Sequence, residues 1–218
     1  CYLNVRYLPP FFSHKSRIVY SNIESINEIS EIQHPSVRGC LEYLNITEGV
    51  EIHHDGDLPA RSGLGSSSSF TVGLLHALYA LKQQMVSPRQ LAEEAIDVEQ
   101  NWLNESVGIQ DQIMAAHGGF QIIEMGPDAN WDTKNMLLPK EYLSSLEDHV
   151  LLGFSGISRM SEKHAKSKVE NIKQGKTNKE LQTIYTLTQE ALQAFQDQAS
   201  FDKIGRLLDQ SWKYKKRL

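Results

Sequence analysis

The residues best suited to chemistry lie in a glycine- and serine-rich loop, residues 58–69, between two predicted elements. Alternating apolar and polar residues at 49–54 predict a strand before the loop, and the apolar run 70–81 predicts a buried helix after it. Such a unit gathers backbone N–H groups at the positive end of a helix dipole, where phosphate binds. The glycines allow close approach of the backbone, and serine hydroxyls can bond phosphate oxygens or a metal ion. The alternative is a serine-rich turn that caps the helix.

The loop has a family resemblance. Pro59, followed after three residues by Gly-Leu-Gly-Ser-Ser, resembles the phosphate loop of the GHMP kinases, the family of galactokinase, homoserine kinase and mevalonate kinase. Arg61 replaces the first glycine of the family form Pro-x-Gly-x-Gly-Leu-Gly-Ser-Ser, as in the D-glycero-D-manno-heptose 7-phosphate kinase branch that this loop resembles. The resemblance implies that ATP is bound by Pro59, Arg61, Ser62, Gly63, Leu64, Gly65, Ser66, Ser67 and Ser68.

A second stretch, Gly-Ile-Gln-Asp-Gln at residues 108–112, resembles the Gly-x-x-Asp-Gln stretch that carries the family's catalytic aspartate. The resemblance implies that Asp111 binds the substrate and serves as the catalytic carboxylate. A carboxylate suits this role because an attacking sugar hydroxyl must lose its proton as it bonds to phosphorus. If the glycine-rich loop is left out of consideration, the alternative is that Asp111 simply caps a short helix.

Glu99 lies twelve residues before Asp111, on a helix that the capping sequence Ser-Pro-Arg-Gln at 87–90 predicts. The family resemblance implies that Glu99 binds Mg²⁺ together with Ser67. Magnesium prefers oxygen and takes one or two protein ligands beside phosphates and waters. The alternative is that Glu99 is solvated, as helix glutamates usually are.

A fourth stretch, residues 153–159, follows a predicted buried strand and precedes a basic run. Gly156, Ser158 and Arg159 are predicted to bind the substrate, because arginine presents a fork of donors to a phosphate group. A similar Gly-x-Ser-Arg stretch occurs in the heptose kinase branch. The alternative, a solvated helix face, stays open for Arg159 and is favoured for the lysines that follow it.

Composition narrows the class of protein. The 218 residues are 40% hydrophobic and carry a net charge of −5, which argues against a nucleic-acid protein held by bulk charge. Two cysteines make no disulfide framework and fit a cytoplasmic protein. No apolar run reaches the roughly 20 residues that span a bilayer. The predicted partners are therefore ATP and a small-molecule sugar phosphate, without nucleic acid or membrane, and a homodimer stays open.

The resemblance implies an α+β protein with the GHMP kinase two-domain fold. Residues 1–147 would be the ATP-binding N-terminal domain, with its start missing, and 148–218 an incomplete C-terminal domain. The pattern predicts a strand pair at 2–7 and 17–20, strands at 120–125 and 149–154, helices at 35–44, 87–104 and 111–117, and a helical region from 161 onward.

These residues together predict an ATP-dependent kinase that phosphorylates the anomeric hydroxyl of D-glycero-D-manno-heptose 7-phosphate. Another sugar-1-kinase, such as a fucokinase, is an alternative, although Arg61 departs from fucokinase loops. A non-catalytic regulator that binds sugar and ATP on the same fold is a second alternative. Glu99 and Asp111 favour the enzyme, because a regulator need not keep both carboxylates.

Overall fold

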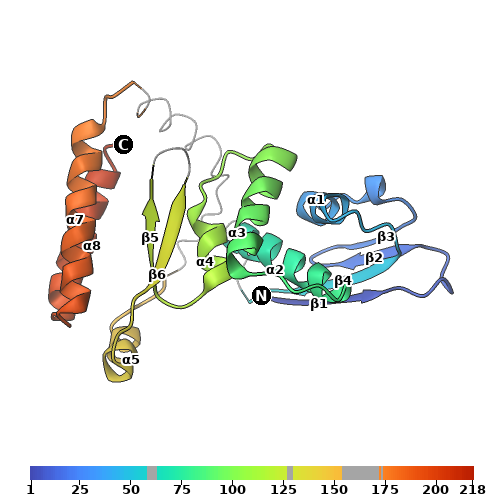
Figure 1. The fold of residues 1–218 in the computed structure, drawn as a ribbon, viewed down its shortest axis with the longest axis horizontal. Helices are drawn as coiled ribbons and strands as arrows, with labels where there is room; N and C mark the ends of the chain where they lie inside the picture. Colours follow the sequence, from blue (N-terminus) through green and yellow to red (C-terminus); the bar gives the residue numbers. More distant parts are fainter. Residues whose placement is uncertain (58–62, 127–129, 154–171, 173) are drawn as a thin grey trace. The chain divides into compact units, whose positions relative to one another are not determined.

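A computed structural model describes residues 1–57, 63–126, 130–153, 172 and 174–218 of the chain. The described residues form two compact units, one over Cys1–Asn135 and the other beginning at Met136. Figure 1 shows the elements of both units along the chain. The first unit ends twelve residues before the predicted domain boundary at 147, and helix α5 (Lys140–Asp148) runs across that boundary. The domain division stays a prediction, because compact units and family domains need not coincide.

A four-stranded sheet forms one side of the first unit, in the order β1-β4-β2-β3. Its strands are β1 (Tyr2–Tyr7), β2 (Ser16–Val19), β3 (Ile23–Ile26) and β4 (Val50–Asp55). The predicted strands near 2–7 and 17–20 are confirmed, but their predicted pairing is wrong. Ile52 of β4 faces Val5 on one side and Ile18 on the other, so β4 separates β1 from β2. The strand richest in buried residues takes the central place, where both of its edges are covered.

Helices α1 (Pro35–Tyr43) and α2 (Ser66–Leu81) supply much of the core of this unit. The helix predicted at 35–44 is confirmed. Its apolar residues Val37, Cys40 and Leu41 are fully buried, and Leu44 directly after it is nearly so. On α2, Leu74, Leu75 and Leu78 have no exposed surface. This burial anchors the helix that follows the glycine-rich loop.

Gly49 allows the chain to enter β4 beside β2. A Cβ atom at this position would overlap the carbonyl oxygen of Lys15, which is backbone and cannot rotate away. We expect Gly49→Ala to lower the free energy of unfolding by about 1–3 kcal/mol, the usual cost of overpacking. Gly126→Ala is the control, because among the described residues its added Cβ would meet only Asn130 O, at 3.6 Å. Equal denaturant midpoints for the two variants would contradict this account.

The predicted helix from residue 87 begins as expected and ends differently. Ser87 caps α3 (Pro88–Asp97), and its hydroxyl accepts a 3.1 Å hydrogen bond from the Gln90 N–H. Instead of continuing as α-helix, the chain forms a π-helical turn, η2 (Val98–Trp102), closed by Leu103 N donating to Val98 O at 2.9 Å. In a regular α-helix Trp102 would share the face of the buried Leu91 and Val98, but the wider turn changes the helical phase, and Trp102 is 49% exposed.

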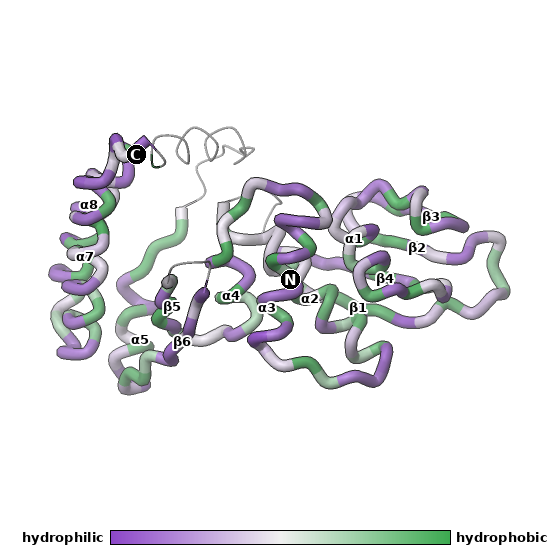
Figure 2. Tube along the Cα trace, turned by 45° about the horizontal axis from the view of Figure 1, so that its top comes forward, coloured by the Kyte–Doolittle hydropathy of each residue, from purple (hydrophilic) through white to green (hydrophobic). Residues whose placement is uncertain are grey.

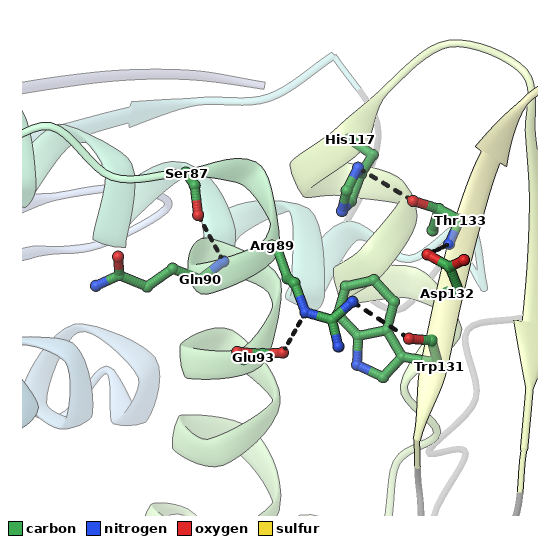
Figure 3. Close-up of polar contacts among 8 residues, drawn as sticks. All are labelled: Ser87, Arg89, Gln90, Glu93, His117, Trp131, Asp132 and Thr133. Atoms are coloured by element: carbon green, nitrogen blue, oxygen red, sulfur yellow. Dashed lines mark hydrogen bonds and ion pairs between the residues drawn. The ribbon is translucent and has the colours of Figure 1, made fainter.

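Helix α4 (Gln110–His117) and the hairpin of β5 (Gln121–Met125) and β6 (Trp131–Asn135) complete the first unit. Trp131 packs against Ala92 of α3 and Ile113 of α4. Figure 3 shows the Arg89 guanidinium over the Trp131 ring, 4.5 Å from its centroid, with Nη1 donating to Trp131 O at 3.3 Å. The hairpin thereby fixes α3 to α4, the two helices that lead to Glu99 and carry Asp111.

The second unit contains α5, α7 (Asn178–Gln196) and α8 (Phe201–Lys215) among its described residues. The helical region predicted from residue 161 onward is confirmed over α7 and α8, and Figure 2 shows hydrophilic and hydrophobic residues alternating along both helices. The buried strand predicted at 149–154 is wrong over 149–153, because those residues pair with no strand and Leu151 is 95% exposed. Residue 154 lies outside the described residues. None of the described helices combines the length and the apolar character needed to cross a bilayer.

Candidate active site

The described end of the glycine-rich loop turns sharply into α2. Gly63 and Gly65 have φ values of 79° and 68°, a left-handed conformation that glycine adopts without strain. Gly65 is the N-cap of α2, so the helix begins at Ser66 rather than at the predicted residue 70. The free N–H groups of the first helical turn therefore belong to the serine run itself. Pro59, Arg61 and Ser62 lie outside the described residues.

Asp111 stands directly against this turn. A Cβ atom at Gly65 would lie 3.2 Å from the Asp111 Cγ and 3.2 Å from its Oδ2, so glycine leaves room for the carboxylate. Both residues line a pocket of about 220 Å³ together with Leu64, Ser69, Met114 and Ala115. Within the described part of the chain, no hydrogen bond or ion pair holds the exposed Asp111 carboxylate. The side chain is thus free to accept a proton or a hydrogen bond from a ligand.

Glu99 lies behind the same turn, in the π-helical segment, and is only 1% exposed. Its Oε2 accepts hydrogen bonds from Ser68 Oγ at 3.0 Å and from Gln112 Nε2 at 2.5 Å. Its Oε1 is buried and has no hydrogen-bond partner among the described residues. The solvated alternative for Glu99 is therefore wrong.

The unpaired Oε1 fits a bound cation. A buried carboxylate oxygen without a partner is costly, and an ion or water would satisfy it. The described residues contain no group of three or more His, Cys, Asp or Glu side chains placed to hold a metal. A single carboxylate beside serine hydroxyls and a phosphate loop suits Mg²⁺, which needs few protein ligands.

The structure thus brings together four predicted site residues, namely Gly65, Ser68, Glu99 and Asp111. The predicted magnesium ligand Ser67 is exposed beside them, and it is the buried Ser68 whose hydroxyl contacts Glu99. Neither that contact nor the hydrogen bond from Gln112 to Glu99 was predicted from the sequence. The signal in the sequence that could have indicated this contact was the side-chain amide of Gln112, directly after Asp111. The predicted substrate residues Gly156, Ser158 and Arg159 lie outside the described residues.

Cys40 does not add a nucleophile to this site. Its side chain is fully buried, and burial together with the Glu99 charge raises the pKa of the thiol far above its usual range. Since the thiolate is the reactive form, this buried thiol is poorly suited to act as a nucleophile.

The assignment of Ser67 and Glu99 to one ion makes a testable prediction. Ser67→Ala and Glu99→Ala should each raise the Mg²⁺ concentration that gives half-maximal activity of the full-length protein. The double variant should lose less than the sum of the two single losses, because both residues act through the same ion. Additive losses with an unchanged Mg²⁺ requirement would show that the two residues act separately. Glu93→Ala, an exposed glutamate of α3, serves as the control.

Comparison with known proteins finds similar sequences and structures. Residues 35–119, which contain the loop, Glu99 and Asp111, match the family described as GHMP kinases N terminal domain. A curated relative, D-glycero-alpha-D-manno-heptose 7-phosphate kinase of Campylobacter jejuni, is 28% identical over 170 residues. That alignment covers 76% of this chain and 48% of the relative, so the chain spans about half the length of the curated relative it matches.

Solved structures share the fold. A putative sugar kinase from Campylobacter jejuni matches with a TM-score of 0.69 and 19% identity, covering 96% of this chain and 64% of that one. A D-glycero-D-manno-heptose 1-phosphate kinase from Bacteriodes thetaiotaomicron matches with a TM-score of 0.65 and 18% identity, covering 99% and 67%. The α+β chain therefore has the fold of the GHMP kinases, and its residues 35–119 are similar to the N-terminal domain of that family.

Proposed function

We propose that the protein to which this chain belongs is an ATP-dependent sugar kinase. The observation that carries the proposal is the approach of Asp111 to Gly65, which places a free carboxylate beside the turn expected to bind phosphate. Phosphoryl transfer needs little more than positioned phosphates, charge neutralisation and a group that orients the nucleophile. The described site contains residues suited to each of these roles.

In this proposal the N–H groups at the start of α2 and the loop serines hold the phosphates of ATP. Asp111 orients the sugar hydroxyl and accepts its proton as the oxygen bonds to the γ-phosphorus, while the bond from that phosphorus to the β–γ bridging oxygen breaks and ADP leaves. Ser67 and Glu99 would hold Mg²⁺, which supplies charge neutralisation for the phosphates when bound. The close packing of Gly65 against Asp111 would keep the acceptor hydroxyl within reach of the transferred group.

For the acceptor we propose the anomeric hydroxyl of D-glycero-D-manno-heptose 7-phosphate, on a cytoplasmic route to nucleotide-activated heptose for surface glycans. Support comes from the 28% identical relative whose name specifies the 7-phosphate. One structural neighbour is named for a heptose 1-phosphate instead, and likeness at 18% identity concerns the fold alone. Arg61 and Arg159 provide cations that could read a sugar phosphate, and both belong to stretches that resemble the heptose branch.

A substrate panel with the full-length protein tests this proposal. ADP release is measured with heptose 7-phosphate, unphosphorylated heptose, mannose, fucose, galactose and mevalonate under identical conditions. We expect substantial release with heptose 7-phosphate alone. Release with fucose or mannose at a similar rate would favour another sugar-1-kinase. Tight binding of ATP and sugar without ADP release from any acceptor would favour the regulator.

A further inference from the structure

We infer that Gln112 and Ser68 are positioning residues that hold the Glu99 carboxylate in one orientation and leave its Oε1 for the ion. This inference rests on the proposed function, since it assigns a purpose to groups behind the proposed magnesium site. Neither side chain touches the reacting atoms in this account. Their effect passes through Glu99.

Both donors converge on a single oxygen of Glu99. Ser68 Oγ and Gln112 Nε2 lie 3.0 Å and 2.5 Å from Oε2, and all three side chains are at most 5% exposed. Two donors on one carboxylate oxygen fix the plane and the rotation of the group, and charge-assisted bonds of this kind are strong. The other oxygen, Oε1, has no hydrogen-bond partner in the described residues. A carboxylate held in this way presents one defined free oxygen.

The carboxamide of Gln112 is oriented by the same contact. Its Oε1 is also buried without a partner in the described part of the chain, so only Glu99 decides which end of the amide faces the carboxylate. A flipped amide would bring an oxygen against the Glu99 oxygen, which is repulsive. Gln112 therefore acts as a donor here. A glutamate or a methionine at this position could not replace that donor.

The backbone supports the same reading. Glu99 lies in the π-helical turn, whose i→i+5 hydrogen bond runs from Leu103 N to Val98 O. Such turns are rare and occur often at functional sites. A regular α-helix would carry Trp102 on the face of the buried Val98, whereas this turn leaves Trp102 half exposed and Glu99 buried. The helix is thus distorted at the residue whose carboxylate is most constrained.

Helix geometry explains why the amide directly follows Asp111. Consecutive residues on an α-helix point about 100° apart, so one helix can serve two places. Asp111 is exposed and lines the pocket beside Gly65, while Gln112 is fully buried and contacts Glu99. The Asp-Gln pair therefore couples the proposed catalytic carboxylate to the proposed metal carboxylate through a single turn of α4.

The test compares Gln112→Met with native full-length protein. Methionine keeps the size and removes the donor. The readout is the free Mg²⁺ concentration that half-maximally enhances binding of a non-hydrolysable ATP analogue, measured by calorimetry. We expect this concentration to rise by roughly 10–100-fold, as for other groups that orient metal ligands. Binding of the analogue in EDTA should stay unchanged. Gln110→Met, an exposed position on the same helix, is the control.

A merely structural role for Gln112 would lower the melting temperature without moving the Mg²⁺ dependence, and that result would overturn the inference. If Gln112→Met does not fold, Ser68→Ala decides, because it removes one hydroxyl from the same oxygen. An unchanged Mg²⁺ dependence for a folded Ser68→Ala protein would then overturn the inference. A native protein whose analogue binding is indifferent to Mg²⁺ would instead overturn the proposed magnesium-dependent kinase itself.

Discussion

Replacing Asp111 by asparagine should lower turnover of the full-length protein by roughly 10²-fold or more, the scale of losing a positioned acid–base group. Asparagine has nearly the same shape, so the close packing against Gly65 should persist. The affinity for ATP should therefore change little, while the transfer step loses its proton acceptor. Steady-state kinetics with saturating sugar, together with calorimetry of ATP binding, would separate the two effects.

Asp132→Asn provides the matched control for this prediction. Asp132 is also exposed, and its Oδ1 accepts a 2.9 Å hydrogen bond from the Thr133 N–H, a bond that asparagine can keep. We expect native turnover from this variant. Near-native turnover of Asp111→Asn would remove Asp111 from the mechanism. It would not make Asp111 a helix cap, because Ile109 is the N-cap of α4 and no side-chain hydrogen bond caps that helix.

Local sequence patterns predicted most helices and strands, because the formation of these elements depends largely on residues that are close in sequence. Ser87 followed by Pro88 specifies the start of a helix, and the capping hydrogen bond joins residues only three positions apart. The pairing of β4 between β1 and β2 was not predictable in the same way, because it joins residues more than thirty positions apart. The π-helical turn at Val98–Trp102 was also missed, since apolar spacing cannot distinguish it from α-helix.

The site was predictable in its members and less so in its contacts. The loop and the Gly-x-x-Asp-Gln stretch identified Gly65 and Asp111, and the structure places them in contact. Which serine faces Glu99 depends on the phase of α2, which begins four residues earlier than the apolar run indicates. That shift buries Ser68 and leaves Ser67 exposed. The hydropathy pattern could not reveal this earlier helix start, because four consecutive serines show no periodic alternation of apolar and polar residues.

The proposed substrate should be preferred because it carries a phosphate of its own. Loss of a partner from a buried charged pair typically costs about 2–5 kcal/mol, or roughly 30- to several-thousand-fold in affinity. We therefore expect kcat/KM for heptose 7-phosphate to exceed that for unphosphorylated heptose, mannose and fucose by at least about 30-fold on that arithmetic. The reason is that an arginine–phosphate pair is bidentate and charge-assisted.

Arg159→Ala and Arg61→Ala in the full-length protein identify the cation that reads the phosphate. Both arginines lie outside the described residues, so these variants test predictions made from the sequence. Arg159→Ala should remove most of the preference for the 7-phosphate while sparing ATP binding. Arg61→Ala should do the same unless Arg61 contacts the nucleotide, in which case the affinity for ATP falls instead. Lys213→Ala, an exposed cation on α8, is the control for a general loss of positive charge. Equal use of free fucose or mannose by the native protein would refute the heptose assignment and leave the kinase assignment standing.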